Sequence, residues 1–291
     1  MAGAVLRQPR APGLMEPIEL LDGRVSGLRW RGGDVPVLAL HGWLDNAHSF
    51  LPLSEHLGGL DLVAVDFPGH GLSAPRPDGV RYHFDDYSFD VLAVLDDLGW
   101  QRANLLGHSL GGAVSTLVAA AAPERVNSMA LIEGLGPLSA PAEKTAEGWR
   151  KAVARSRPRN RRVHAGRHDA VAARQQGSDL SEASTRLLAE RGLVEADGGW
   201  QWRHDQRLTW PTAHRYTEPQ VIDLLAHIEA PVLNVHSDPG TGLMNQRMFQ
   251  LRLAALQHRR ETVSCPGGHH LHMLYPERIA PNILEHFHDA A

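Results

Sequence analysis

A Gly-x-Ser-x-Gly pentapeptide is the feature that most constrains how this chain of 291 residues can fold. It spans residues 107–111, and the apolar run 102–106 before it is typical of a short buried strand. Small apolar residues follow from Gly112 to Ala122, as in a helix packed on a sheet. A strand, a sharp turn and a helix in this order raise the hydroxyl of Ser109 above the edge of a sheet. The glycines suit such a turn because a β-carbon would obstruct neighbouring backbone.

Strand-like apolar runs alternate with helical patterns along most of the chain. The predicted strands are Ile18–Leu21, Val25–Trp30, Val35–Leu40, Leu62–Val65, Ala103–Leu106, Ser128–Ile132, Val232–Val235 and Thr262–Cys265. The predicted helices are Ser49–Leu57, Tyr87–Leu98, Leu110–Ala122, Met244–Leu256 and Pro276–His288. Several strands are continuously apolar, as strands covered on both faces must be. The alternation predicts an α/β fold with a mostly parallel eight-stranded sheet flanked by helices, in which the first two strands form a hairpin.

The segment 137–229 interrupts this alternation. It is rich in arginine and lacks strand patterns, and its residues 217–220, Thr-Glu-Pro-Gln, are typical of a capping box that begins a helix. We therefore expect a helical cap, inserted after the sixth strand, in residues 137–229. The core would comprise residues 16–136 and 230–291, preceded by a flexible leader at residues 1–15.

Composition gives only broad limits on function. A formal net charge of -4 offers no argument for nucleic acid as a partner, and 43% hydrophobic with 21% charged residues is ordinary for a globular chain. A single cysteine, Cys265, excludes an intramolecular disulfide and suits a reducing compartment. The chain has no long uncharged apolar run, and Met1 to Met15 lacks the apolar centre of a secretory signal. We expect a cytoplasmic protein without a membrane span, and the oligomeric state stays open.

Four motifs in a fixed order carry a family resemblance. They are His41-Gly42-Trp43, the run Asp66 to Ser73, the pentapeptide at Ser109 extended by Gly112, and Gly268-His269-His270-Leu271-His272. Together they resemble the serine-type α/β-hydrolase superfamily, and the first and last are similar to its serine hydrolase-like (kraken-related) group. The resemblance covers about Val35 to His288 and is weakest in the cap. It implies the α/β-hydrolase fold and serine chemistry, but it defines the substrate poorly.

The resemblance assigns a nucleophile and a base. Ser109 is the implied nucleophile, and a neutral serine needs a base within hydrogen-bonding reach and a carboxylate that orients this base. His269 is the implied base, because it follows a glycine after the last strand and is followed by His272 and by Pro276-Glu277 in the register of the family. The neighbouring His270 is an alternative, and we expect His272 to serve packing or to make a surface polar contact.

Two carboxylates compete for the orienting role. The commonest family position for the acid follows the seventh strand, where Asp238 lies slightly early and Gly240 or Thr241 occupies the usual place. Some branches of the superfamily place the acid at the end of the sixth strand, where Glu133 lies 24 residues after Ser109. A carboxylate that ends an apolar strand is also costly unless it is paired. We favour Glu133 and keep Asp238, which also suits an Asp-Pro turn, as the alternative acid.

The resemblance also implies an oxyanion hole formed by the backbone amides of Trp43 and Leu110. The Trp43 side chain by itself would equally suit a core aromatic. Asp66 to Ser73 is expected to form a structural turn. The stretch Arg150 to Arg174 could attract anionic substrates or lipid surfaces, although a solvated cap helix is the simpler interpretation. His164 and His168 would be four apart on a helix, but without further ligands they predict no metal site.

These assignments predict hydrolysis of an ester, or a related acyl bond, of a small to medium substrate through an acyl-enzyme intermediate. The reaction would need no cofactor or metal. Thioester, lactone and carbon-carbon bond hydrolysis stay open, whereas dehalogenase and epoxide hydrolase chemistry is disfavoured because those branches use an aspartate where this chain has Ser109. A non-catalytic or very slow small-molecule binder is the alternative from another functional class.

Overall fold

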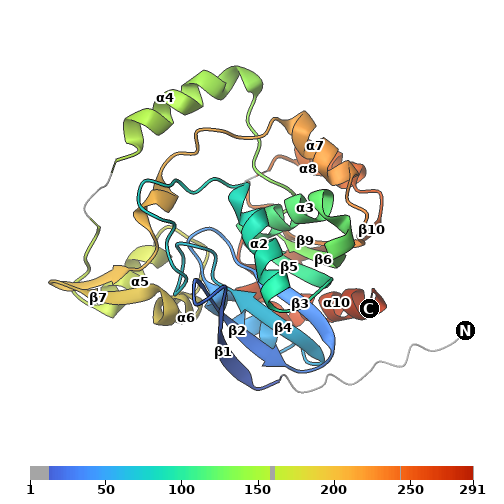
Figure 1. The fold of residues 1–291 in the computed structure, drawn as a ribbon, viewed down its shortest axis with the longest axis horizontal. Helices are drawn as coiled ribbons and strands as arrows, with labels where there is room; N and C mark the ends of the chain where they lie inside the picture. The colour runs from blue at the N-terminus through green and yellow to red at the C-terminus, as the bar shows by residue number, and fades with distance from the viewer. Residues whose placement is uncertain (1–12, 158–160, 243, 291) are drawn as a thin grey trace, which may run out of the picture.

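A sheet of eight strands forms the centre of the molecule (Figure 1). The computed structural model describes residues 13–157, 161–242 and 244–290. The strands of the sheet are β1 (Met15–Leu20), β2 (Val25–Arg31), β3 (Val35–Leu40), β4 (Leu60–Val65), β5 (Ala103–His108), β6 (Val126–Ile132), β9 (Val232–Asp238) and β10 (Arg259–Pro266). Their order is β1-β2-β4-β3-β5-β6-β9-β10. β2 pairs antiparallel with β1 and with β4, and the other neighbours are parallel. The predicted hairpin and mostly parallel sheet are confirmed.

Helices cover both faces of the sheet. The helical elements of the core are η1 (Ala47–Phe50), α1 (Leu51–Ser54), α2 (Asp86–Asp97), α3 (Leu110–Ala121), α8 (Gln246–Ala255), α9 (Leu271–Leu274) and α10 (Pro276–Asp289), with a short η2 (Pro123–Arg125) before β6. α2, α3 and α8 contribute to one apolar cluster, and η1, α1, α9 and α10 contribute to the other.

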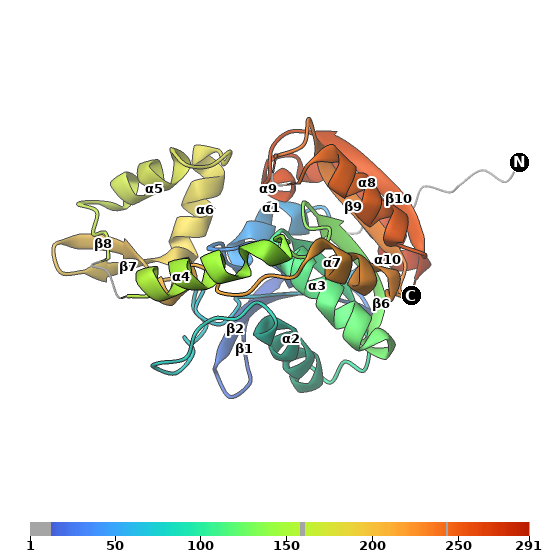
Figure 2. The ribbon, with the colours of Figure 1, turned by 90° about the horizontal axis from the view of Figure 1, so that it is seen from above.

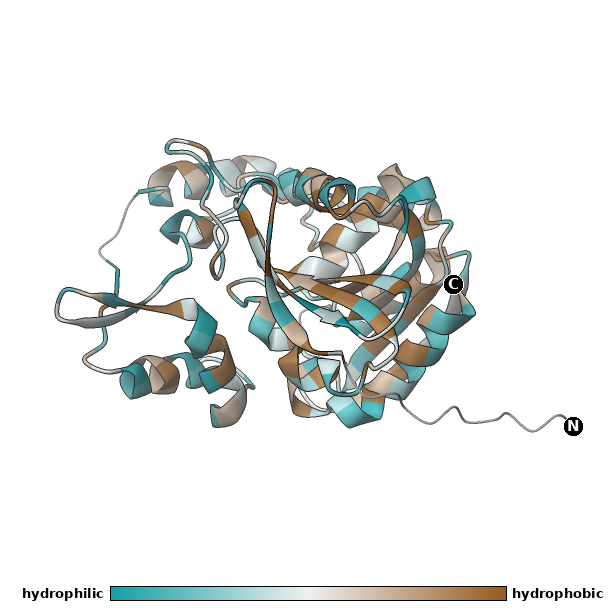
Figure 3. Cartoon of the chain, turned by 60° about the horizontal axis from the view of Figure 1, so that its bottom comes forward, coloured by the Kyte–Doolittle hydropathy of each residue, from teal (hydrophilic) through white to brown (hydrophobic). Residues whose placement is uncertain are grey.

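Alternation along the strands explains why the sheet has two apolar faces. In β3, Leu38 and Leu40 belong to the cluster with α2 and α3, whereas Val37 and Ala39 belong to the cluster with α1 and α10. Successive side chains of a strand point to opposite faces, so a strand that is apolar at every position is stable only between two layers of helices. Figure 3 shows the hydrophobic colour concentrated on these central strands.

The segment between β6 and β9 contains the expected helices and also a hairpin. Its elements are η3 (Ala142–Lys144), α4 (Thr145–Arg155), α5 (Arg167–Gln175), α6 (Glu182–Gly192), β7 (Leu193–Ala196), β8 (Gly199–Trp202), η4 (Gln206–Thr209) and α7 (Glu218–Ala226). The antiparallel pairing of β7 with β8 corrects our expectation that this segment lacks strands. The signal was present in the sequence, because Asp197-Gly198 is a favoured two-residue hairpin turn and Gly198 has a φ of 83°.

The helix α7 packs on the core rather than on α5 and α6. Its Val221 and Leu225 are fully buried in the cluster that includes α3 and α8. The two carboxylate oxygens of Glu218 accept hydrogen bonds from the buried Arg252 of α8, at 2.8 and 2.7 Å. Figures 1 and 2 show α7 beside α8 and far from α5, β7 and β8. The predicted capping box is present, since the Gln220 side chain accepts a hydrogen bond from the Thr217 amide at 2.8 Å.

The N-terminal end of the described chain is part of the sheet. Met15, which we assigned to the leader, is the first residue of β1, and residues 1–12 of that leader lie outside the described residues. Cys265 is buried in β10 and is not in a disulfide. Among the described residues, we find no helix with the length and apolar character needed to traverse a bilayer.

Candidate active site

Ser109 lies at a sharp turn between β5 and α3, with a φ of 51° and a ψ of -109°. Such a backbone conformation costs about 1 to 3 kcal/mol for a residue other than glycine, and it persists only where surrounding contacts hold it. Here the Ser109 amide donates to the Ile132 carbonyl at 2.9 Å, and the Gly111 amide donates to the His41 carbonyl at 3.1 Å. A β-carbon on Gly111 would lie 1.9 Å from the Leu40 carbonyl oxygen, so the position requires glycine. The expected strand-turn-helix corner is thus confirmed.

His269 lies beside this corner, in the turn between β10 and α9. The Nε2 atom of His108 is 2.9 Å from the His269 carbonyl oxygen, and the two imidazole rings are 4.8 Å apart. Because a carbonyl only accepts, His108 Nε2 carries a proton in this contact. His108 is fully buried, and burial together with the neighbouring histidines keeps its pKa well below the usual range. A neutral His108, immediately before Ser109, therefore holds the backbone of His269 in place.

Glu133 follows the last residue of β6 and faces His269. Its Oε2 atom lies 3.6 Å from Nδ1 of His269, an ion-pair contact slightly longer than a hydrogen bond. Its Oε1 accepts a hydrogen bond from the Ser237 amide at 2.6 Å, and its Oε2 accepts one from the Thr241 hydroxyl at 3.0 Å. Burial raises the pKa of Glu133, but its interactions with His269, Ser237 and Thr241 outweigh this effect and leave the pKa below its usual value. Glu133 is therefore ionised where it faces the imidazole.

The alternative acid, Asp238, is exposed at the end of β9. Thr241, one of the two residues that we placed at the usual family position after this strand, donates its hydroxyl to Glu133 at 3.0 Å. The structure thus brings Ser109, His269 and Glu133 to the same edge of the sheet, where β5, β6 and β10 end, and leaves Asp238 in solvent.

His41 shapes the loop that carries the Trp43 amide. The Phe67 amide donates to Nε2 of His41 at 2.9 Å, so the proton resides on Nδ1, which lies 2.7 Å from the Gly42 carbonyl oxygen. Burial lowers the pKa of His41 and favours this neutral form. Both ring nitrogens are therefore used to fix the backbone immediately before Trp43.

Of the two implied oxyanion donors, Trp43 lies in the loop after β3 and Leu110 lies at the start of helix α3. Leu110 is the first residue of α3, where amides have no intrahelical acceptor. Among the described residues, neither the Leu110 amide nor the Trp43 amide has a protein acceptor. The Trp43 side chain is 54% exposed, so its interpretation as a core aromatic is wrong. Its indole nitrogen donates to the Leu208 carbonyl in η4 at 3.1 Å, which connects this loop to the segment between β6 and β9.

His270 forms an ionic cluster between the core and the segment that joins β6 to β9. Its Nδ1 lies 2.5 Å from Oδ1 of Asp179, and its Nε2 lies 3.6 Å from Oδ2 of Asp45. Arg174 of α5 completes the cluster through a 2.6 Å contact with Asp45. Burial alone would lower the pKa of His270, but Asp179 and Asp45 raise it to about 9. A protonated imidazole cannot accept a proton, which argues against His270 as the base. Sequence reasoning missed Asp45, Asp179 and Arg174.

Two other motif residues, His272 and Asp66, contribute to packing and to local backbone structure. His272 is fully buried with its ring 4.1 Å from that of His108, and burial lowers its pKa to about 3. Asp66 accepts hydrogen bonds from the amides of Ala47 and Leu72, each at 2.7 Å, and forms a buried ion pair with Arg191 of α6 at 2.8 Å. The packing role expected for His272 and the structural turn at Asp66 are confirmed.

The described part of the chain contains no group of three or more His, Cys, Asp or Glu side chains arranged to hold a metal. His164 precedes α5 and bridges to Trp200 through its backbone, whereas His168 lies within α5. These two histidines therefore do not share a helix, contrary to the sequence pattern.

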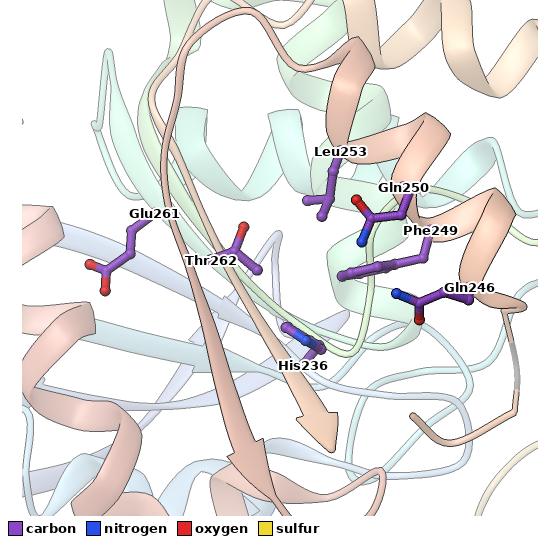
Figure 4. Close-up of a pocket in the computed structure, with 7 residues that line it drawn as sticks. All are labelled: His236, Gln246, Phe249, Gln250, Leu253, Glu261 and Thr262. Carbon is purple, nitrogen blue, oxygen red and sulfur yellow. The ribbon is translucent and has the colours of Figure 1, made fainter. Parts of the chain in front are cut away.

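A cavity of about 450 Å³ lies between α8 and the strands β9 and β10 (Figure 4). Its lining includes His236, Phe249 and Thr262, but neither Ser109 nor His269. It therefore lies under α8, apart from the serine corner. A second cavity, of about 390 Å³, is lined by residues of the segment between β6 and β9.

Comparisons with known proteins agree with this geometry. The model of the family described as alpha/beta hydrolase fold matches residues 35–276. A serine hydrolase-like protein of Danio rerio is 30% identical over 262 residues, which cover 86% of this chain and 80% of that protein.

Solved structures are similar over nearly the whole chain. A hypothetical protein of Pseudomonas aeruginosa PAO1 is 40% identical with a TM-score of 0.83, covering 94% of this chain and 97% of its own. An esterase of Mycobacterium tuberculosis is 25% identical with a TM-score of 0.73, covering 94% of this chain and 91% of its own. By its sheet, its serine corner and these matches, the chain belongs to the alpha/beta hydrolase fold family and is similar to the serine hydrolase-like proteins within it.

Proposed function

We propose that this chain hydrolyses a carboxylic ester, or a related acyl bond, of a small to medium substrate through an acyl-enzyme intermediate on Ser109. The observation that carries the proposal is the ionised Glu133 facing His269, 3.6 Å from its Nδ1, beside the strained corner that holds Ser109. The hydrolase names and the esterase structure among the similar proteins support the same class of reaction.

In the proposed first step, Nε2 of His269 accepts the proton of the Ser109 hydroxyl as its oxygen attacks the carbonyl carbon. Glu133 stabilises the imidazolium and keeps the other ring proton on Nδ1. His269 then gives the proton to the leaving alcohol, and the ester bond breaks. Water repeats the sequence on the acyl-enzyme and restores Ser109. The proton that leaves with the alcohol is replaced from the attacking water, so the proposed cycle balances without a cofactor.

The amides of Trp43 and Leu110 would stabilise the negative charge that develops on the carbonyl oxygen. Both are free of protein acceptors in the described chain, and Leu110 is at the positive end of α3. Loss of one such donor typically costs about 100-fold to 1000-fold in rate. The same machinery would act on thioesters and lactones, and graded substrates decide among them.

A fluorophosphonate probe tests the proposal directly. It should label the wild-type chain and fail to label Ser109→Ala, because labelling requires an activated serine. Hydrolysis of p-nitrophenyl esters of graded acyl length should disappear in the same variant. A wild-type chain that is properly folded but neither labels nor hydrolyses any of these esters would instead be a small-molecule binder on a hydrolase fold.

Paired variants test the choice of acid. Glu133→Gln should lower kcat by about three to four orders of magnitude, as loss of the orienting carboxylate does in serine hydrolases. Asp238→Asn is the matched control, since this side chain is exposed at the end of β9, and it should leave kcat nearly unchanged. A crippling effect of Asp238→Asn alone would refute the assignment of Glu133.

A further inference from the structure

The second cavity has a strongly basic lining. It measures about 390 Å³, and its lining includes Arg157, Arg161, Arg162, Arg174, Trp202 and Trp210. The lining comes from the segment before α5, from α5 itself, from β8, and from η4 and the residues beside it. No aspartate or glutamate is among the lining residues of this cavity. The combination of guanidinium groups with indole rings suits a ligand that has both an anionic and an apolar part.

Three arginines of the lining have no ion-pair partner in the part of the chain that the structure describes. Arg157, Arg161 and Arg162 are exposed, and within the described residues none of them forms an ion pair. Arg174, at the inner end, is different, because it contacts Asp45 at 2.6 Å and stacks 5.0 Å from the Trp202 ring centroid. Its Nε is nevertheless buried without a protein partner.

Both histidines of the lining have lowered pKa values, to which the nearby arginines contribute. Burial, and then the charges of Arg174 and Arg161, lower the pKa of His204 to about 4. Burial and the charge of Arg162 likewise lower the pKa of His164. Three carboxylates lie nearby: Asp45 is paired with Arg174 at 2.6 Å, Asp205 is paired with Arg207 at 2.6 Å, and Asp169 only partly offsets the effect on His164. The cavity therefore retains an excess of positive charge at neutral pH.

Two contacts connect the cavity to the loop that carries the oxyanion amide. Leu208, between the lining residues Gln206 and Thr209, accepts a hydrogen bond from the Trp43 indole at 3.1 Å. Arg174 contacts Asp45, two residues after Trp43. A ligand held in the cavity would thus lie on the cap side of the loop whose backbone faces the reacting carbonyl.

We propose that this cavity binds an oxyacid group of the substrate, a carboxylate or a phosphate, and so selects anionic acyl esters. The proposal rests on the proposed hydrolase function and adds the substrate class to it. Exposed guanidinium groups bind carboxylate and phosphate in two-pronged geometry, and their charge also accelerates the encounter with an anion.

Binding is measured apart from catalysis, in the Ser109→Ala chain by isothermal titration calorimetry. The probes are glutarate, inorganic phosphate and the neutral glutaramide. We expect one or both anions to bind and the diamide not to bind, and the preferred anion identifies the oxyacid. Adding Arg161→Gln and Arg162→Gln should weaken anion binding about fivefold to tenfold, the range expected for two solvent-accessible ion pairs. Arg150→Gln, an exposed arginine of α4 outside the cavity, is the matched control and should have no effect.

Kinetics then test the link to the reaction. Wild-type chain should cleave mono-p-nitrophenyl glutarate with a higher kcat/KM than the corresponding neutral amide ester, and added salt should reduce the difference. The double variant should lose this preference without losing activity on the neutral ester. If phosphate is the better probe in calorimetry, the ester pair is replaced by a phosphorylated ester and its alcohol.

The outcomes separate the two proposals. If the wild-type chain cleaves the neutral ester but shows neither preference for the anionic one nor arginine-dependent anion binding, the cavity proposal is overturned and the hydrolase proposal stands. If anions bind equally well in the double variant, the site is elsewhere and the cavity proposal is also overturned. If the fluorophosphonate probe does not label the wild-type chain and neither ester is cleaved, the hydrolase proposal fails. The assignment of the bound anion as part of the substrate then fails with it.

Discussion

Replacing His270 by glutamine should remove a large part of the pH dependence of stability above neutral pH. The pKa of His270 is raised from 6.5 to about 9 in the folded chain, because Asp179 and Asp45 outweigh the effect of burial. A group whose pKa is raised by folding stabilises the folded state fully below its unfolded pKa, and this contribution disappears as the pH rises through the folded pKa. The window for His270 therefore runs from pH 6.5 to about 9.

The size of the effect follows from the same shift. The difference of about 2.5 pKa units corresponds to about 3 kcal/mol, at 1.36 kcal/mol per unit. The side chain of His270 is 11% exposed, so solvent screens this interaction little. The wild-type chain should lose about this amount of unfolding free energy across the window, and His270→Gln should not. Asp179→Asn, which removes one of the two carboxylates, should give an intermediate loss.

Urea denaturation followed by tryptophan fluorescence, at several pH values across the window, measures the difference. His168→Gln is the control, because His168 is an exposed histidine of α5. The buried His108 and His272 have lowered pKa values, so their contributions are lost as the pH falls below 6.5 and do not overlap with this window. An equal slope of stability against pH in wild-type chain and His270→Gln would refute the reasoning.

Three further substitutions test the packing of the fold. Arg252→Met removes the buried guanidinium that donates to Glu218 and to the Leu135 carbonyl, and it should cost about 1 to 3 kcal/mol in urea denaturation, because Glu218 is 25% exposed and keeps its hydrogen bond from Ser139. Ser109→Gly should be more stable than Ser109→Ala by about 1 kcal/mol, and should therefore unfold at a higher temperature, since glycine adopts a positive φ without strain. Equal unfolding temperatures of the two variants would show that the corner is unstrained. Gly111→Ala should not yield a folded chain with a normal circular dichroism spectrum, because its β-carbon would overlap the Leu40 carbonyl.

The alternation of strands and helices predicted most of the core because it reflects local rules. A strand that is apolar at every position, such as β3, can be predicted from its own residues, since such a strand must be covered on both faces. The corner at Ser109 was equally readable, because the two glycines and the flanking patterns belong to one short segment. The β7–β8 hairpin was not predicted, although the sequence contains its Asp-Gly turn, because each of its strands has only four residues, too few for a clear alternating pattern.

The electrostatic cluster around the candidate site could not be predicted in this way. The sequence favoured Glu133 over Asp238 as the acid and His269 over His270 as the base, but it left both alternatives open. The fold places Glu133 against His269, while it encloses His270 between Asp179 of the cap and Asp45 of the core.

The sequence by itself therefore determined the layered architecture and the strained serine corner, since both arise from residues that are neighbours along the chain. Tertiary structure alone decided which carboxylate faces which imidazole, because Asp179 and His270 are 91 residues apart and Glu133 and His269 even farther. A histidine's proton affinity depends on the charges and burial around its ring, and those surroundings exist only when β6, β10 and the cap come together.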